Sequence, residues 1–261
     1  TWAIRSPGGV PKQTPMDTSC TKGDCYQDYR TANIGRKRVL LVGSNDGMLH
    51  AFDAGSAQLS ATPDITGNYP YDNGTGAELW AFVPPDLLPR LKDLMSAHQY
   101  MVDGSVMLRD VWVDGSNATD GQNTPAAPTG LDGKKQVREF HTVAIFGRRS
   151  GGNQYSALDV TDPNKPTFLW NFPQGGSDDS RYMGESWAEF APRPPPIVPV
   201  KLAATAASPA SDQARGFSER WVVVVGGGYD PTLTRGRAVF MLDAWTGTTL
   251  WRFTDDDFKT N

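Results

Sequence analysis

The sequence has few residues that bind transition metals, with two cysteines and three histidines among 261 residues. The histidines, His50, His98 and His141, lack the paired spacing of zinc ligands. No uninterrupted apolar run approaches the length of a membrane span, so we expect no transmembrane segment. The formal net charge of -4 provides no electrostatic attraction for nucleic acid. These absences argue against zinc-finger, membrane-spanning and nucleic-acid-binding proteins.

A signal peptide is also missing, and the chain begins with Thr1 rather than methionine. We therefore expect a processed chain or a part of a longer one. The 27 glycines and 20 prolines fall between strand-like runs rather than in one block. This distribution is typical of many short strands joined by turns, so we expect an all-β protein. An apolar content of 38% is enough to bury one large core or two small ones.

The two cysteines, Cys20 and Cys25, lie in the segment TSCTKGDC. A disulfide between them would indicate an oxidising compartment. Two reduced surface thiols, or half of a zinc site, are the alternatives that the spacing leaves open. The scattered histidines count against zinc.

The clearest pattern is the last complete unit, residues 220–253. A β-branched run stops at three glycines, a second apolar run ends at Asp243, and a third strand closes at Trp251. We expect the Asp243 carboxylate to cap the amides of the turn and Gly247 to adopt a positive φ. Trp251 is expected to pack as a large apolar plate against a neighbouring sheet.

This unit recurs twice upstream. Residues 39–83 contain it with an insertion at 54–74, and residues 143–172 contain it in compact form, closed by Trp80 and Trp170 respectively. Because one small sheet cannot bury both faces, such repeats typically stack as the blades of a β-propeller. About three blades are present, whereas closed propellers have four to eight. We therefore expect a partial β-propeller with long loops, packed against further blades of the same or another polypeptide.

The remaining segments give coarser predictions. We expect residues 1–35 to form an irregular N-terminal arm and residues 36–261 to form the β-propeller segment. One short helix is predicted after Pro84 and Pro85, with Asp86 as its N-cap and an apolar stripe that packs on a blade. The stripe consists of Leu87, Leu88, Leu91, Leu94 and Met95.

Further local predictions concern the connections between strands. Residues 99–103 and 106–113 flank Asp103, Gly104 and Ser105, which predicts a β-hairpin. Residues 197–202 are expected to form a strand, and residues 203–219 a flexible loop rich in alanine and serine. The segment Asn45-Asp46-Gly47 predicts a tight hairpin turn.

Several stretches imitate catalytic or ligand-binding motifs without their context. Ser186 in GESWA has no strand before it and no helix after it, as a nucleophile elbow requires. The glycines at 226–228 do not open a helix, as a phosphate loop does. Asp114, Ser116 and Asp120 do not match the register of a calcium loop. We therefore predict no catalytic residue and no cofactor-binding residue, and leave metal ligands unassigned.

Three surface features remain. The basic cluster Arg36-Lys37-Arg38 is interpreted as a solvated strand end rather than a binding site for an acidic partner. Tyr69 and Tyr71, in the insertion, are expected either to contact a partner or to decorate the surface. The residues at 255–257, all aspartate, form a cation site only if further oxygen ligands come from elsewhere.

At a larger scale, five runs in this order resemble the PilY-type family of type IV pilus biogenesis factors and tip adhesins: GSNDGMLHAFDA, ELWAFVP, HQYMVDGSVMLRDVWVDG, HTVAIFGRRSGGNQYSALDVTDP and WVVVVGGGYDP. The resemblance spans roughly residues 39–254. Its most specific parts are residues 157–163 and 78–84. The tryptophan-ended repeats alone fit any quinoprotein-like propeller.

The resemblance implies a C-terminal β-propeller region of a large secreted adhesin. It implies a non-enzymatic role at the pilus tip or outer cell surface, after export through the periplasm, in pilus assembly, cell adhesion and twitching motility. Minor pilins, other tip components and the remaining propeller blades are the implied partners. Calcium is implied only for a loop downstream of the third repeat in the full-length protein, so no ligand in this segment is assigned.

Two other functions are weighed against this one. A quinone-dependent dehydrogenase propeller is suggested by the spacing from Asp243 to Trp251, but it needs a full ring, a calcium ion and a catalytic aspartate. An outer-membrane protein-assembly scaffold would also use a propeller, and would bind other proteins through its loops without any association with pili.

Overall fold

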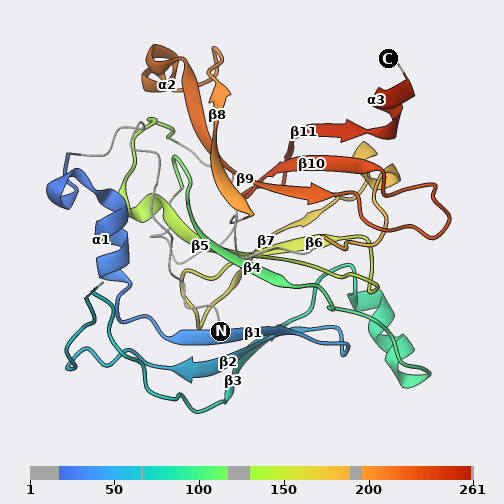
Figure 1. The fold of residues 1–261 in the computed structure, drawn as a ribbon, viewed down its shortest axis with the longest axis horizontal. Helices are drawn as coiled ribbons and strands as arrows, with labels where there is room; N and C mark the ends of the chain where they lie inside the picture. Colours follow the sequence, from blue (N-terminus) through green and yellow to red (C-terminus); the bar gives the residue numbers. More distant parts are fainter. Residues whose placement is uncertain (1–17, 66, 117–129, 189–195, 260–261) are drawn as a thin grey trace.

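The structure is a computed structural model, and it describes residues 18–65, 67–116, 130–188 and 196–259 (Figure 1). These residues are mostly β, as predicted, and form three antiparallel sheets. The first sheet contains β1 (Arg38–Gly43), β2 (Leu49–Gly55) and β3 (Glu78–Phe82). The second contains β4 (Val106–Trp112), β5 (Phe140–Gly147), β6 (Tyr155–Asp159) and β7 (Thr167–Phe172). The third contains β8 (Ile197–Ala203), β9 (Phe217–Gly226), β10 (Ala238–Asp243) and β11 (Thr249–Thr254).

Within each sheet the strands follow one another in chain order, and each pairs with the next. The three repeats predicted from the sequence are therefore confirmed, and β1, β5 and β9 are their equivalent strands. The second and third sheets carry one additional strand before the repeat, β4 and β8. The first sheet has no counterpart of β4 and β8 among the described residues.

Two hydrophobic layers hold the sheets together. One lies between the first and second sheets and contains Leu49, Phe146 and Leu158. The other lies between the second and third sheets and contains Ile145 and Phe240. Because both faces of the second sheet are covered, all eight residues of β5 are buried. Figure 1 shows the resulting series, with the first sheet in blue to cyan, the second in green to yellow and the third in orange to red.

The N-terminal segment contains a helix that the sequence analysis missed. Residues 1–17 lie outside the described residues, but α1 (Cys25–Ala32) is helical, so the expectation of an irregular arm is wrong there. Asp24 caps α1 by accepting a hydrogen bond from the Gln27 N–H. The predicted disulfide is confirmed between Cys20 and Cys25, and Cys25 is fully buried. The division of domains at residue 35 stays a prediction.

The helix predicted after Pro85 is a 3₁₀-helix, η2 (Leu88–Met95). With three residues per turn, Leu88, Leu91 and Leu94 lie in line, but Met95 leaves their face. Leu87 is fully buried, whereas Leu88 and Met95 are 55% and 93% exposed, so the prediction of a packed stripe is wrong for these two residues. Asp86 does not cap the helix, because its carboxylate pairs with the buried Arg148 at 2.8 Å.

The predicted hairpin over residues 99–113 is also wrong. β4 pairs with β5 across a long connection, and residues 99–103 form no strand. Their backbone instead binds the turn of the first sheet, where the Val102 N–H donates to Ser44 O and the Met101 N–H donates to Asn45 Oδ1. This segment therefore links the first sheet to the second.

The connection at residues 203–219 is more ordered than predicted, since it contains α2 (Ala210–Arg215) and the start of β9. The expected strand at 197–202 is confirmed as β8, and the Asn45-Asp46-Gly47 turn is confirmed by the Gly47 N–H bond to Ser44 O. The other helices are η1 (Thr21–Gly23), η3 (Val137–Glu139), η4 (Asp178–Arg181) and α3 (Asp255–Lys259). None of the helices in the described ranges is long and apolar enough to cross a membrane.

Candidate functional site

An aspartate lies at or near the end of the middle strand of each repeat, and its carboxylate accepts hydrogen bonds from the backbone that follows. Asp243 accepts hydrogen bonds from the N–H groups of Trp245 and Thr246, both at 2.9 Å, as predicted. Asp159 accepts from the Thr161 N–H at 2.9 Å, and Asp53 accepts from the Gly55 N–H at 3.0 Å. The aspartates are therefore structural caps of the turns.

A β-bulge changes the direction in which the tryptophan at the end of each repeat points. Trp80, Trp170 and Trp251 each pair with the strand before, but the leucine that precedes each tryptophan is left out of the pairing. These leucines are Leu79, Leu169 and Leu250. A bulge of this kind breaks the two-residue alternation and redirects a side chain.

Two of the three indoles bind the next sheet in the series. The Trp80 indole N–H donates to Pro163 O at 2.8 Å, and the Trp170 indole N–H donates to Ala244 O at 3.1 Å. Both acceptors lie in the turn that follows the capping aspartate of the next repeat. The Trp170 ring also lies against Gly247, where a Cβ atom would approach ring carbons at 2.6 Å. Gly247 has φ of +69°, so both the turn and the ring require glycine there.

Trp251 occupies the same position in the third repeat, but its environment differs. It is 51% exposed, and within the described residues no sheet covers it, so the predicted packing against a neighbouring sheet is not found for this tryptophan. Its ring stacks on Phe253 with 6.3 Å between centroids. Val224 and Val239 lie on the same face and are 49% and 40% exposed. We call this set, together with Met241, the open face of the third sheet.

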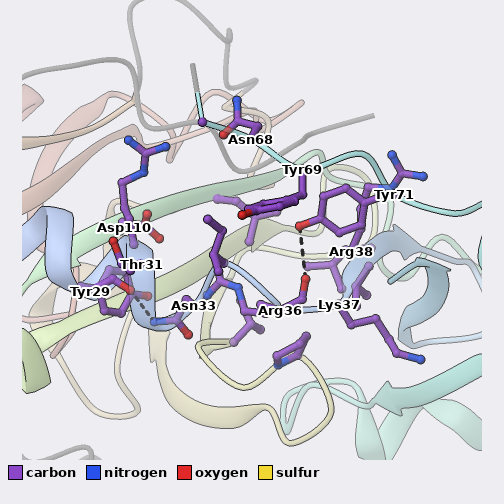
Figure 2. Close-up of a pocket in the computed structure, with 18 of the residues that line it drawn as sticks. Tyr29, Thr31, Asn33, Arg36, Lys37, Arg38, Asn68, Tyr69, Tyr71 and Asp110 are labelled. Atoms are coloured by element: carbon purple, nitrogen blue, oxygen red, sulfur yellow. Dashed lines mark hydrogen bonds between the residues drawn. The ribbon is translucent and has the colours of Figure 1, made fainter. Parts of the chain in front are cut away.

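A cavity of about 470 Å³ lies where α1, the start of β1 and the loop around Tyr69 meet the second sheet (Figure 2). Apolar side chains that line it come from both neighbouring sheets, and include Leu41 and Leu108. Polar lining residues include Arg36, Asn33 and Asp110. Cavities of this size bind small molecules or side chains in many proteins.

The basic cluster at the start of β1 lines this cavity, and the interpretation of it as a solvated strand end is wrong, because all three side chains bond within the protein. Arg36 donates to the Thr142 hydroxyl at 2.8 Å. Lys37 pairs with Asp53 at 3.0 Å, and this ammonium is the main cause that holds the pKa of Asp53 below its usual value. Arg38 donates to Ala54 O at 2.9 Å. The cluster therefore ties β1 to its surroundings.

The two tyrosines of the insertion lie over the same cavity. The Tyr71 hydroxyl donates to Arg36 O at 3.2 Å, as drawn in Figure 2, and the Arg38 guanidinium lies over its ring. Tyr69 lines the cavity, and Figure 2 shows its ring next to that of Tyr71. The insertion is thus part of a concave surface.

A buried polar network closes the side of the cavity next to α1. The Tyr29 hydroxyl lies 2.9 Å from the Thr142 hydroxyl, which in turn donates to Asp110 at 2.6 Å. Burial, and then the charge of Asp110, raise the pKa of Tyr29 to about 12. Tyr29 therefore stays neutral and serves to anchor α1 on β5.

Three acidic residues have the spacing to hold a metal ion. Asp114, Asp132 and Glu139 each bring a carboxylate oxygen within 4.8 Å of the others, and they are the one such group in the ranges that the structure describes. Oxygen ligands of this type suit calcium, which takes six to eight of them. Asp120, the third residue of the sequence pattern, lies outside the described residues, and Ser116 instead lies 2.9 Å from His141.

The same carboxylates are already satisfied by the protein. The Gly133 N–H donates to Asp114 at 2.9 Å, and the Trp112 indole N–H donates to Glu139 at 2.9 Å. Burial is the main cause that raises the pKa values of Asp114 and Glu139. Because the protein already provides hydrogen-bond donors to these carboxylates, the acidic group does not by itself define a metal site.

The other motifs of the sequence have structural roles. The Ser186 hydroxyl is buried, accepts from the Arg148 N–H at 2.7 Å and donates to Gln154 O at 2.9 Å. The glycines at 226–228 end β9 and lead into the loop before β10. The acids at 255–257 have separate partners: Asp255 pairs with Arg237 at 3.0 Å, and Asp257 accepts from the Thr254 N–H at 2.7 Å.

Sequence reasoning missed the cavity and the acidic group, because both join segments that are far apart in the chain. The β-bulges, in contrast, have a signal in the sequence. A leucine stands directly before the tryptophan that ends each repeat, and two consecutive apolar residues break the alternation expected of a strand.

No family model matches the chain, but comparisons with known proteins find relatives. It is 28% identical over 228 residues to the type IV pilus biogenesis factor PilY1 of Pseudomonas aeruginosa, a match that covers 85% of this chain and 14% of that protein. It is 30% identical over 256 residues to a PilY1 homolog of Xylella fastidiosa, covering 94% of this chain and 12% of that protein. The chain therefore spans a small part of the length of these relatives.

A solved structure agrees with these similarities. The crystal structure of the Pseudomonas aeruginosa PilY1 C-terminal domain matches with a TM-score of 0.50 and 26% sequence identity. The match covers 88% of this chain and 32% of that domain. The resemblance expected from the sequence is confirmed.

Proposed function

We propose that this chain, a homologue of the C-terminal region of PilY1-type pilus biogenesis factors, is a non-enzymatic structural and adhesion segment of a protein at the type IV pilus tip. Its role is to support pilus assembly, surface attachment and twitching motility, in contact with minor pilins and other tip components. The Cys20–Cys25 disulfide supports a place outside the cytoplasm.

One observation carries the proposal. The same tryptophan contact joins the first sheet to the second and the second to the third, but the equivalent tryptophan of the third sheet has no sheet to contact among the described residues. Trp80 and Trp170 each reach a backbone carbonyl of the next sheet, whereas Trp251 is half exposed on an apolar face. We infer that a further sheet docks on the open face of the third sheet and that the three sheets are blades of a larger propeller. The related domain supports this, because the chain matches only 32% of it.

The enzyme alternative is less well supported by the geometry. In the described residues, the repeated aspartates are engaged in their turns, and Ser186 is buried with its hydroxyl bonded to backbone groups. A quinone-dependent dehydrogenase needs an aspartate free to act on a bound substrate. Dye-reduction turnover by the purified protein, with added quinone and calcium, would overturn the non-enzymatic proposal.

The direct test uses the full-length protein in the bacterium that produces it. Trp251→Glu places a charge on the open face, while Leu88→Glu places one on η2, where the side chain is 55% exposed and distant from the open face in the chain. We expect Trp251→Glu to reduce surface pili about tenfold because an unpaired charge in an interface is costly, and Leu88→Glu to leave them unchanged. Sheared pili are quantified by immunoblot, and co-purified minor pilins are measured in parallel.

Two results would contradict the proposal. Wild-type amounts of pili and of co-purified minor pilins in the Trp251→Glu strain would show that the open face has no role in pilus assembly. Loss of outer-membrane proteins with normal pili would instead favour the assembly-scaffold alternative.

A further inference from the structure

Among the described residues, the first sheet has one strand fewer than the other two. β5 and β9 each pair on both edges, with β4 and β8 on the side away from the rest of the repeat. β1 is the equivalent strand of the first sheet, and in the described residues it pairs only with β2. The edge of β1 that corresponds to the β4 and β8 positions is therefore open.

The hydrogen-bond pattern shows which groups of β1 face this open edge. The Ser44 N–H donates to Met48 O and closes the β1–β2 hairpin. Since bonded and non-bonded pairs alternate in an antiparallel ladder, Leu40 and Val42 bond to β2, and the N–H and C=O groups of Val39 and Leu41 point the other way. From the described part of the chain, no backbone group bonds to them. Such an edge is a template for another strand.

The cavity of about 470 Å³ lies next to this edge. The side chains of Val39 and Leu41 line it from β1, and that of Leu108 lines it from β4. An extended segment paired with β1 would direct every second side chain into this space. The cavity thus offers pockets for alternate side chains beside a row of unpaired main-chain groups, which is the arrangement by which sheets recognise extended peptides.

The positive charge around the cavity favours a peptide that carries a carboxylate. Arg30, Arg36 and Arg38 line it, and Asp110 is the one acidic residue among the described residues that line it. Arg36 and Arg38 are partly engaged in hydrogen bonds, but Arg30 makes no hydrogen bond or ion pair with the residues that the structure describes. A carboxylate on the incoming strand would pair with Arg30.

We propose that the open edge of β1 binds an extended, acidic segment of another polypeptide, which completes the first sheet as its fourth strand. β4 and β8 come from the chain that precedes their repeats, but the described segment before β1 forms α1, whose Tyr29 is packed on β5. The occupant that fits the cavity and Arg30 has alternating apolar side chains and at least one carboxylate.

The test uses the full chain and a capped synthetic peptide of about seven residues, alternating valine and threonine with one glutamate, as a generic extended strand. Backbone amide exchange is followed by NMR. We expect the peptide to slow exchange at Val39 and Leu41 by about tenfold or more, and to leave Leu40 and Val42, already bonded to β2, unchanged. Peptides N-methylated on alternate residues should bind in one register and fail in the other, because methylation removes the N–H groups that pair with β1.

The charge is tested by fluorescence anisotropy with the same peptide. Arg30→Glu should weaken binding about tenfold, whereas Arg235→Glu, which changes an exposed arginine in the loop after β9, should leave it unchanged. Two results would overturn the proposal. Val39 and Leu41 amides that are already as slow as Leu40 in the free chain would show that the chain covers its own edge. Equal binding of both methylated peptides would show that main-chain pairing is not involved.

Discussion

Trp170 and Trp251 hold the same place in two repeats but lie in opposite environments. Trp170 is 4% exposed, donates its indole N–H to Ala244 O, and lies against Gly247 of the third sheet. Trp251 follows the same leucine bulge and is 51% exposed. The local sequence therefore determines how the tryptophan is presented, and only the presence of a following sheet determines whether it is buried.

The largest expected effect separates these two tryptophans. Trp170→Ala removes a buried ring and its hydrogen bond, and should lower the free energy of unfolding by about 3–5 kcal/mol. Trp251→Ala removes a half-exposed ring and should cost about 1 kcal/mol or less. Urea unfolding of the purified chain, followed by circular dichroism, measures both. Equal losses for the two variants would contradict the contrast drawn between the two repeats.

A smaller loss of stability is expected at Gly247, the glycine against which the Trp170 ring packs. Gly247→Ala introduces a Cβ atom 2.6 Å from the ring and strains a φ of +69°, so we expect a loss of about 2 kcal/mol in the free energy of unfolding. Gly176→Ala is the matched control, because its φ is +78° but no atom lies within 4 Å of the added Cβ.

The control isolates the backbone strain, and we expect it to cost about 1 kcal/mol. The difference between the two glycine variants then measures the contact with Trp170. Combining Gly247→Ala with Trp170→Ala should abolish that difference, since the ring that the methyl group meets is gone. Simple additivity of the two substitutions would show that the contact contributes nothing.

The smallest effect is expected on the outer face of the first sheet, at the other end of the series. His50 lies 2.9 Å from both Glu78 and Asp46, and the hydrogen bond to Glu78 is the main cause that raises its pKa. A raised pKa means that the stabilisation is fully present below the unfolded-state value of about 6.5 and is lost as the pH rises through the folded-state value. Because Asp46 and Glu78 are 43% and 46% exposed, screening keeps the contribution below about 1 kcal/mol.

This pH dependence is measured by urea unfolding at pH 6 and pH 9. His50→Gln should be less stable than the parent chain at pH 6 and nearly equal to it at pH 9. His98→Gln, which changes an exposed histidine that contacts Tyr100, is measured in parallel as the control for loss of a histidine. A larger deficit of His50→Gln at pH 9 than at pH 6 would show that the two carboxylates do not stabilise the protonated ring.

Much of the fold was predictable because its signals are local. The β-branched runs, the aspartate before each turn and the glycine of positive φ depend on neighbours in the chain, and all three repeats were recognised from them. The spacing of Cys20 and Cys25 likewise favoured the disulfide that the structure contains.

The errors come from tertiary contacts that override local preference. Asp86 has the chemistry of an N-cap, but the buried guanidinium of Arg148 recruits it, since a buried charge needs a partner. Residues 99–103 have the composition of a strand, but they bond the turn at Ser44 and Asn45. The cavity depends on α1, β1 and the insertion together, so no single stretch of sequence could reveal it.

The three leucine bulges have a geometric consequence. Each adds one unpaired residue to the strand that ends a repeat, at Leu79, Leu169 and Leu250, and a bulge increases the local right-handed twist of its strand. Because the extra residue recurs at the same register, we expect it to add the same local twist to each of the three sheets. Each bulge thus affects the angle between its own sheet and the next one. Deletion of one of these leucines is expected to change that angle at a single position in the series.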